Sequence, residues 1–282
     1  MEGKSIYMDH GSTTAVEEEV VQAMQPWFAQ QYGNPSGVYE FADSSKKAVE
    51  LARETIAESI GAKPEEIYFT AGGTEADNWI LKGIAFKDGA PNGRKHIITS
   101  AIEHHAVLHS CRFLERMGCE VTYLPVDEAG MIDVRELEQA IRPETVLISI
   151  MFANNEIGTI EPVRKIGQIA KKYQIPFHTD AVQAYLHVPI QVEEMGITAL
   201  SASSHKFNGP KGVGFLYLRK GTELEPFLHG GAQEKRMRAG TENVPGIVGM
   251  GKAVELGMRY MEQDMVYVRE LRDYMLYQLF RE

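Results

Sequence analysis

The strongest constraint on the fold is the alternation of short apolar runs with longer helical patterns. Strand-like runs lie at residues 95–99, 120–124, 145–150, 176–179, 197–201 and 213–218, with a further short strand before the Gly72-Gly73 turn. Helical patterns lie at about 17–30, 39–60, 74–86, 104–118, 133–141 and 161–173. This alternation predicts an α/β fold with a mainly parallel sheet that helices cover on both faces.

Lys206 lies between the last two strand-like runs, where an apolar strand meets a glycine-punctuated turn. Lys206 follows His205 and precedes Gly209, Gly212 and Gly214. Glycines let the backbone approach closely, and a lysine in such a crowded setting suits an amine that forms a Schiff base with a buried aldehyde. A solvated loop lysine is the alternative interpretation.

An acid ends an earlier apolar run, at Asp180. A carboxylate at the carboxyl end of a strand opens into the crevice where open α/β sheets bind ligands. Pyridoxal phosphate needs a lysine for its aldehyde and an acid for its pyridinium nitrogen, and Lys206 and Asp180 supply both. Asp180 alone would also suit the N-cap of a helix.

A third element fits the same ligand. Gly72, Gly73 and Thr74 lie between a short strand and a helix start, with Thr74 free to cap the helix. Free N–H groups at the positive end of a helix suit a phosphate, although Gly-Gly-Thr also serves as an ordinary turn. Neither the Gly-x-Gly-x-x-Gly dinucleotide pattern nor a Walker sequence is present.

A series of collinear motifs extends over nearly the whole chain, at residues 7–14, 33–37, 70–75, 102–106, 154–158, 178–183, 204–206, 229–234 and 238–243. In this order they resemble the cysteine desulfurases of the NifS/IscS group, in the class V aminotransferase branch of fold-type I pyridoxal-phosphate enzymes. The resemblance implies an aspartate-aminotransferase-like large domain at 15–255, with a seven-stranded sheet that contains one antiparallel strand. Residues 1–14 and 256–282 would then be incomplete segments of a small domain.

The resemblance also implies roles for individual residues. Lys206 would hold the cofactor as an internal aldimine, His104 would stack on its ring, and Asp180 would pair with the ring nitrogen. The other cofactor contacts would be Gln183 and Asn155 near the phenolic oxygen, Gly73, Thr74, Ser203 and His205 at the phosphate, and Thr241 at the phosphate of a neighbouring subunit. From the residues alone, His104 also suits a polar helix start.

Composition argues against some functional classes. Lysine and arginine number 29 against 39 acidic residues, so the formal net charge of -10 disfavours direct nucleic-acid binding. We find no run of about 18 apolar residues and no signal peptide, so we expect a cytoplasmic protein without a membrane segment. The spacing of Cys111 and Cys119 indicates no metal site.

The end of the chain, from about 244 to 280, predicts one or two long amphipathic helices. Their apolar stripe contains Val254, Met258, Met261, Met265, Val268, Leu271, Met275 and Leu279. In the family such helices lead into a small domain that carries a nucleophilic loop cysteine and a carboxylate-binding arginine. Neither is in this sequence, and we expect Cys111 and Cys119 to be buried structural residues.

The resemblance implies conversion of L-cysteine to L-alanine by a pyridoxal 5'-phosphate-dependent homodimer. Sulfur would pass through a persulfide to an acceptor, such as an iron–sulfur scaffold or a tRNA-thiolation protein. Without the loop cysteine we expect the 282-residue chain to be inactive alone. The alternatives are another class V reaction, such as transamination or selenocysteine lysis, and a catalytically silent dimer that binds the cofactor.

Overall fold

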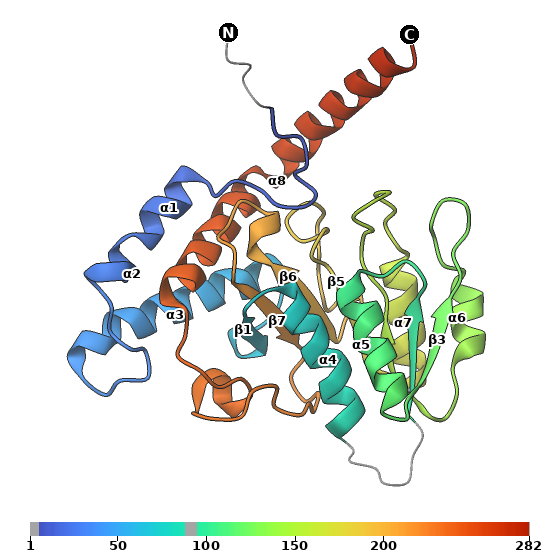
Figure 1. Ribbon diagram of the computed structural model, residues 1–282, viewed down its shortest axis with the longest axis horizontal. Coiled ribbons are helices and arrows are strands. Elements are labelled where there is room, and N and C mark those ends of the chain that lie inside the picture. The colour runs from blue at the N-terminus through green and yellow to red at the C-terminus, as the bar shows by residue number, and fades with distance from the viewer. Residues whose placement is uncertain (1–5, 88–94, 282) are drawn as a thin grey trace.

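The computed structural model describes residues 6–87 and 95–281. A seven-stranded sheet with the order β1-β7-β6-β5-β4-β2-β3 forms its centre (Figure 1). The strands are β1 (Ile67–Thr70), β2 (His96–Ser100), β3 (Glu120–Leu124), β4 (Thr145–Ser149), β5 (Phe177–Asp180), β6 (Ala199–Ser203) and β7 (Gly214–Leu218). β7 is antiparallel to both of its neighbours, and the other pairs of strands described are parallel. The expected sheet is confirmed, including its one antiparallel strand.

Helices connect the strands and cover the sheet. They are α1 (Glu18–Met24), α2 (Pro26–Ala29), α3 (Glu40–Ser59), α4 (Gly73–Lys87), α5 (His105–Arg116), α6 (Val134–Ala140), α7 (Val163–Tyr173) and α8 (Val244–Leu279), with short 3-10 turns η1 (Pro64–Glu66), η2 (Ser204–Lys206) and η3 (Gln233–Arg236). The helix expected over 17–30 is two helices. Pro26 opens the second one and has no N–H with which to continue the first.

Both faces of the sheet are buried, in two separate apolar clusters. Ile98 and Ile148 belong to a cluster with side chains of α3, α7 and α8. Their strand neighbours Ile97 and Leu147 belong to a second cluster with side chains of α4 and α5. Successive strand residues point to opposite faces, so a sheet covered on both sides requires the continuous apolar runs seen in the sequence.

The direction of the strands determines where polar groups gather. β1, β6, β5, β4 and β2 share one direction, so their carboxyl ends lie at one edge of the sheet. β1 leads into the Gly72 turn and α4, β5 ends at Asp180, and β6 leads directly into η2 with Lys206. The topology therefore brings these three segments to the same edge.

The C-terminal pattern forms one long helix, α8, and only its first part is buried. Val254 is in the core, whereas Val268 is 61% exposed and Leu271 is 49% exposed. Figure 1 shows the end of α8, in red, extending away from the sheet. The expected apolar stripe thus leaves the core after its first turns. Among the described helices, none has the length and apolar character needed to cross a membrane.

Gly167 tests the packing of α7 against the segment that precedes β6. A Cβ atom at this position would overlap the carbonyl oxygen of Met195. We expect Gly167→Ala to lower the free energy of unfolding by about 2 kcal/mol, because the overlap outweighs a gain of roughly 1 kcal/mol in helix propensity. Chemical denaturation of the purified protein measures the change.

Gln168→Ala provides the matched control, since Gln168 is exposed on the same helix. Its effect should stay within about 0.5 kcal/mol. A Gly167→Ala variant as stable as the parent protein would contradict the packing described here.

Candidate active site

The carboxyl edge of the sheet opens into a cleft of about 1210 Å³. Its walls come from residues 9–13, the β1–α4 turn, and the segments that follow β4, β5 and β6. The cleft is lined by Gly73, Thr74, His104, Asn155, Asp180, Gln183, Ser203, His205 and Lys206, which are all predicted site residues. Thr241 is the exception: it is exposed and does not line this cleft.

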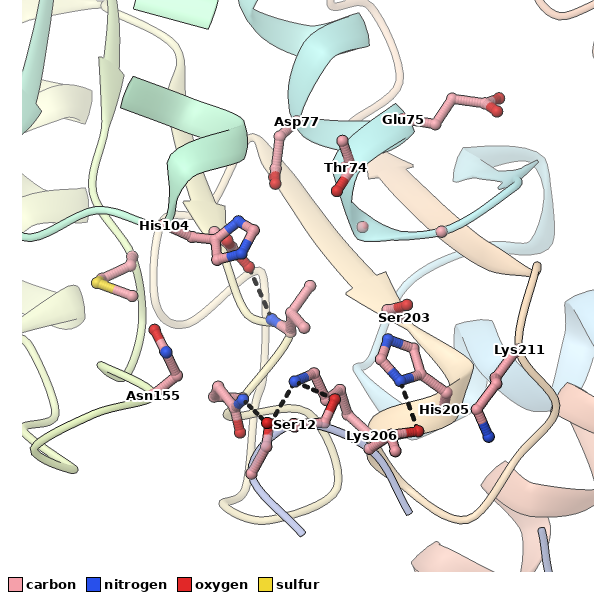
Figure 2. A pocket seen from close by; sticks show the side chains of 18 of the residues that line it. Ser12, Thr74, Glu75, Asp77, His104, Asn155, Ser203, His205, Lys206 and Lys211 are labelled. Atoms are coloured by element: carbon pink, nitrogen blue, oxygen red, sulfur yellow. Dashed lines mark hydrogen bonds between the residues drawn. The ribbon is translucent and has the colours of Figure 1, made fainter. Parts of the chain in front are cut away.

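Lys206 lines the cleft and lies beside Ser12 in Figure 2. Its Nζ donates hydrogen bonds to the backbone carbonyls of Gly11 and Ser12, the latter at 2.9 Å. Burial lowers the pKa of Lys206, and the negative charges of Asp180 and other nearby acids oppose this effect. A lysine with a lowered pKa has a larger fraction of neutral amine, which is the form that attacks an aldehyde.

Asp180 is 5% exposed and ends β5. One of its carboxylate oxygens accepts a hydrogen bond from the backbone N–H of Val182, at 2.9 Å. No helix begins here in the described chain, so the N-cap interpretation of Asp180 is wrong. Burial raises the pKa of Asp180, whereas the Val182 N–H and the positive charges of His104 and Lys206 lower it. The cleft therefore contains a buried acid with cationic groups nearby.

His104 satisfies both interpretations of its motif. It is the N-cap of α5, where its Nδ1 accepts a hydrogen bond from the backbone N–H of Ala106 at 3.1 Å. The same side chain lines the cleft, where Figure 2 shows it on the side of Asn155. Because Nδ1 is an acceptor, a neutral His104 carries its proton on Nε2. The hydrogen bond at the helix start thus holds Nδ1 in place, while the imidazole ring still lines the cleft.

The N-terminus of α4 forms the opposite side of the cleft. The helix begins at Gly73, and the N–H of Ala76 donates to the carbonyl of Gly72 at 3.2 Å. Thr74 therefore lies in the first turn, and its predicted role as the helix cap is wrong. A Cβ atom on Gly73 would overlap the side chain of Val182, so only glycine leaves this position open.

This side of the cleft suits a phosphate. Figure 2 shows Thr74, Ser203, His205 and Lys211 there, around the positive end of α4. Backbone N–H groups, hydroxyls and a lysine are the donors that a phosphate accepts from. The residues present therefore fit the phosphate of pyridoxal phosphate, and Lys206 and Asp180 fit its aldehyde and ring nitrogen.

Some cleft residues were missed in the sequence. The carbonyl of Gly11 accepts from both Lys206 and the Gln183 side chain, the latter at 2.8 Å. Asp77 lines the cleft from α4, and Lys211 lines it from the segment after η2. The sequence could have pointed to Asp77, because an acid four residues after Gly73 lies on the same face of the helix as that glycine.

Neither cysteine of the chain lines the cleft. Cys111 is buried in the apolar cluster of α4 and α5, and burial raises the pKa of its thiol to about 12. Cys119 is partly buried, and burial raises its pKa as well. Among residues 6–87 and 95–281, no group of three or more histidine, cysteine, aspartate or glutamate side chains is arranged to hold a metal ion.

Comparisons with known proteins identify the family of this chain. Residues 6–281 match the family model described as aminotransferase class-V. A cysteine desulfurase IscS of Methanosarcina thermophila is 59% identical over 272 residues, which cover 96% of this chain and 67% of the relative. A cysteine desulfurase IscS of Dictyoglomus turgidum is 54% identical over 273 residues, covering 97% of this chain and 69% of the relative.

Solved structures give the same result. A NifS-like protein superposes with a TM-score of 0.95 at 39% identity, covering 99% of this chain and 76% of that chain. A structure described as SspA in complex with cysteine has a TM-score of 0.87 at 45% identity, covering 89% and 72%. The chain therefore belongs to the class V aminotransferase family, whose desulfurases depend on pyridoxal phosphate. Within this family it belongs with the cysteine desulfurases of the NifS/IscS group.

The cysteines can be distinguished by alkylation. At mildly alkaline pH we expect iodoacetamide to label Cys119 faster than Cys111, because a buried thiol with a raised pKa forms little thiolate. Mass spectrometry of peptides after timed quenching measures both rates. Denatured protein is the control and should be labelled equally at both positions, whereas rapid labelling of Cys111 in the folded protein would contradict its burial.

Proposed function

We propose that this chain binds pyridoxal 5'-phosphate in the cleft and takes L-cysteine there as a cysteine desulfurase. The observation that carries the proposal is that the Lys206 amine, the buried Asp180 carboxyl and the glycine-rich start of α4 line one cleft. A lysine, an acid and a phosphate cradle are the three groups that this cofactor requires of a protein. The relatives named cysteine desulfurase support L-cysteine as the substrate.

Each cleft residue then has a chemical task. When bound, pyridoxal phosphate supplies an electron sink for the carbon that carries the substrate amine. Lys206 holds the cofactor through its aldehyde carbon and moves protons, Asp180 keeps the ring nitrogen protonated, and His104 presents its ring to the cofactor. We assign the phenolic oxygen to Asn155 and Gln183 and the phosphate to Gly73, Thr74, Ser203 and His205.

Thr241 has a task only in an assembly. It is exposed and lies outside the cleft, in the segment before α8. We therefore propose a homodimer in which Thr241 reaches the phosphate bound by the partner subunit. A threonine hydroxyl suits this task because it donates a hydrogen bond to an anion.

Sulfur transfer needs a thiol at the cleft. An acceptor thiolate attacks the sulfur of L-cysteine, an S–S bond forms, the C–S bond breaks, and the carbon takes a proton to give alanine. Cys111 and Cys119 do not line the cleft. We propose that the acceptor thiol belongs to another molecule or to protein beyond these 282 residues. From there the sulfur passes to an iron–sulfur scaffold or a tRNA-thiolation protein of the cytoplasm.

Lys206→Ala tests the lysine assignment. We expect the purified protein to be yellow when loaded with pyridoxal phosphate, and the variant to lose this band while it keeps part of its affinity through the phosphate contacts. The Lys206 amine is the group that bonds to the aldehyde, because the other lysine of the cleft, Lys211, lies on the side assigned to the phosphate. Borohydride reduction followed by peptide mapping gives the position of the bond.

Lys211→Ala is the matched control, because Lys211 lines the same cleft. It should keep the yellow band at the position of the parent protein and bind the cofactor less tightly. Reduced cofactor found on any lysine other than Lys206 would contradict the assignment.

Turnover tests the source of the acceptor thiol. We expect little or no alanine from L-cysteine with the loaded 282-residue protein alone, and alanine that increases with an added dithiol. The double variant Cys111→Ser, Cys119→Ser should retain this dithiol-dependent rate, since neither side chain reaches the cleft. Alanine formed without dithiol, together with a persulfide on Cys119, would overturn the structural role of the cysteines and exclude a catalytically silent dimer.

A further inference from the structure

Asp77 is a buried acid at the cleft without a role so far. It lies in the first half of α4, is 1% exposed and lines the cleft near Asp180. Figure 2 shows its carboxyl pointing from α4 into the cleft. Its Oδ1 has no hydrogen-bond partner among the described residues. A buried carboxylate oxygen without a partner is costly, and such an atom in a native structure calls for an explanation.

The imidazole nearest to Asp77 does not neutralise it. Nε2 of His178 lies 3.6 Å from Oδ1, which is too long for a hydrogen bond. The two ring nitrogens instead lie 2.9 Å from the hydroxyls of Ser149 and Ser201. Burial lowers the pKa of His178 to about 3, so this imidazole is neutral at physiological pH. Asp77 therefore has no cation in contact with it on β5 or β6.

Two other acids face the same region. Asp180 lies at the end of β5, and Glu103 lies before α5. Glu103 accepts hydrogen bonds from the Ser100 hydroxyl at 2.7 Å and the Met151 N–H at 2.8 Å, yet burial raises its pKa to about 8. Three carboxyls in one buried region repel one another when they are ionised. Of the three carboxyls, the one with cationic neighbours remains ionised at the lowest free-energy cost.

That carboxyl is Asp180. The positive charges of His104 and Lys206 lower its pKa against the effect of burial. Asp77 has no such help: burial raises its pKa well above the ordinary value, and the charge of Asp180 raises it further, against a hydrogen bond from Ser201. The pKa of both acids is raised by burial, but only Asp180 has the charges of His104 and Lys206 to oppose the rise.

We propose that Asp77 is a positioning residue that remains a neutral carboxylic acid, so that Asp180 is the single ionised carboxyl where the cofactor ring binds. The proposal rests on the proposed function in taking Asp180 as the partner of the ring nitrogen. An ionised Asp77 would compete with Asp180 for the ring proton and would place a second negative charge in the same buried space. A protonated Asp77 fills that space without charge.

Infrared difference spectroscopy of the cofactor-free protein tests this inference directly. A protonated carboxylic acid has a C=O band that a carboxylate lacks. We expect the parent protein at neutral pH to show bands of buried protonated acids, one of which is lost in Asp77→Asn. Glu103→Gln is the control and should remove a different band. A difference spectrum in which Asp77→Asn removes only carboxylate bands would overturn the proposal.

Two further readouts use the same variant. The folded-state pKa of Asp77 lies above that of an unfolded aspartate, about 3.9, so the parent protein loses stability as pH rises from there through the folded pKa. Asp77→Asn should therefore gain stability relative to the parent as pH rises. When the variant is loaded with pyridoxal phosphate, the pH at the midpoint of its absorbance change should stay within about 0.3 unit of that of the parent protein. A stability difference that does not depend on pH, or a midpoint shift above about one unit, would overturn the proposal.

Asp180→Asn separates this inference from the function on which it rests. Loss of the ring partner should shift the absorbance midpoint of the loaded protein by more than about one pH unit. An unchanged midpoint would contradict the assignment of Asp180 to the ring nitrogen and with it the reason given for Asp77. The infrared bands need no cofactor, so a failure there concerns the protonation of Asp77 alone.

Discussion

The burial of both faces of the sheet is the constraint on which the rest of the structure depends. Neighbouring residues of β2 and β4 point into two different apolar clusters, so helices must cover each face. Parallel strands that are joined by covering helices end at one edge, and the turns that follow them lie together. The cleft is a consequence of this packing, and its walls come from segments that are far apart in the chain.

Electrostatics in the cleft follow from burial more than from net charge. Burial shifts Lys206 toward its neutral amine and shifts Asp180 toward its neutral acid, while their mutual attraction acts in the opposite direction. Asp77 and Glu103 experience the burial without an adjacent cation. A cofactor with a phosphate and a basic ring nitrogen brings the charges that complement this arrangement. The excess of acidic residues in the whole chain has little part in it.

Local patterns predicted most elements but not their finer geometry. The strands and the order of helices follow from apolar periodicity, because a core-facing residue is needed every second or every third to fourth position. Pro26 marks the break between α1 and α2, but the apolar pattern continues across it over 17–30 and predicted a single helix. His104 acts as a helix cap and as a cleft residue at once, which periodicity alone cannot distinguish. The exposed end of α8 has the same apolar pattern as its buried start, so the sequence did not separate them.

The α/β class and the candidate roles of Lys206 and Asp180 could be predicted from the sequence, because both depend on residue type beside a recognisable strand end. Tertiary structure alone decided which distant groups meet. The carbonyls of Gly11 and Ser12 reach the Lys206 amine, and Glu234 accepts two hydrogen bonds from the buried Arg53 guanidinium, both at 2.9 Å. Such contacts join segments whose local patterns contain no information about each other. Only the packing of the sheet and its helices fixes their distance.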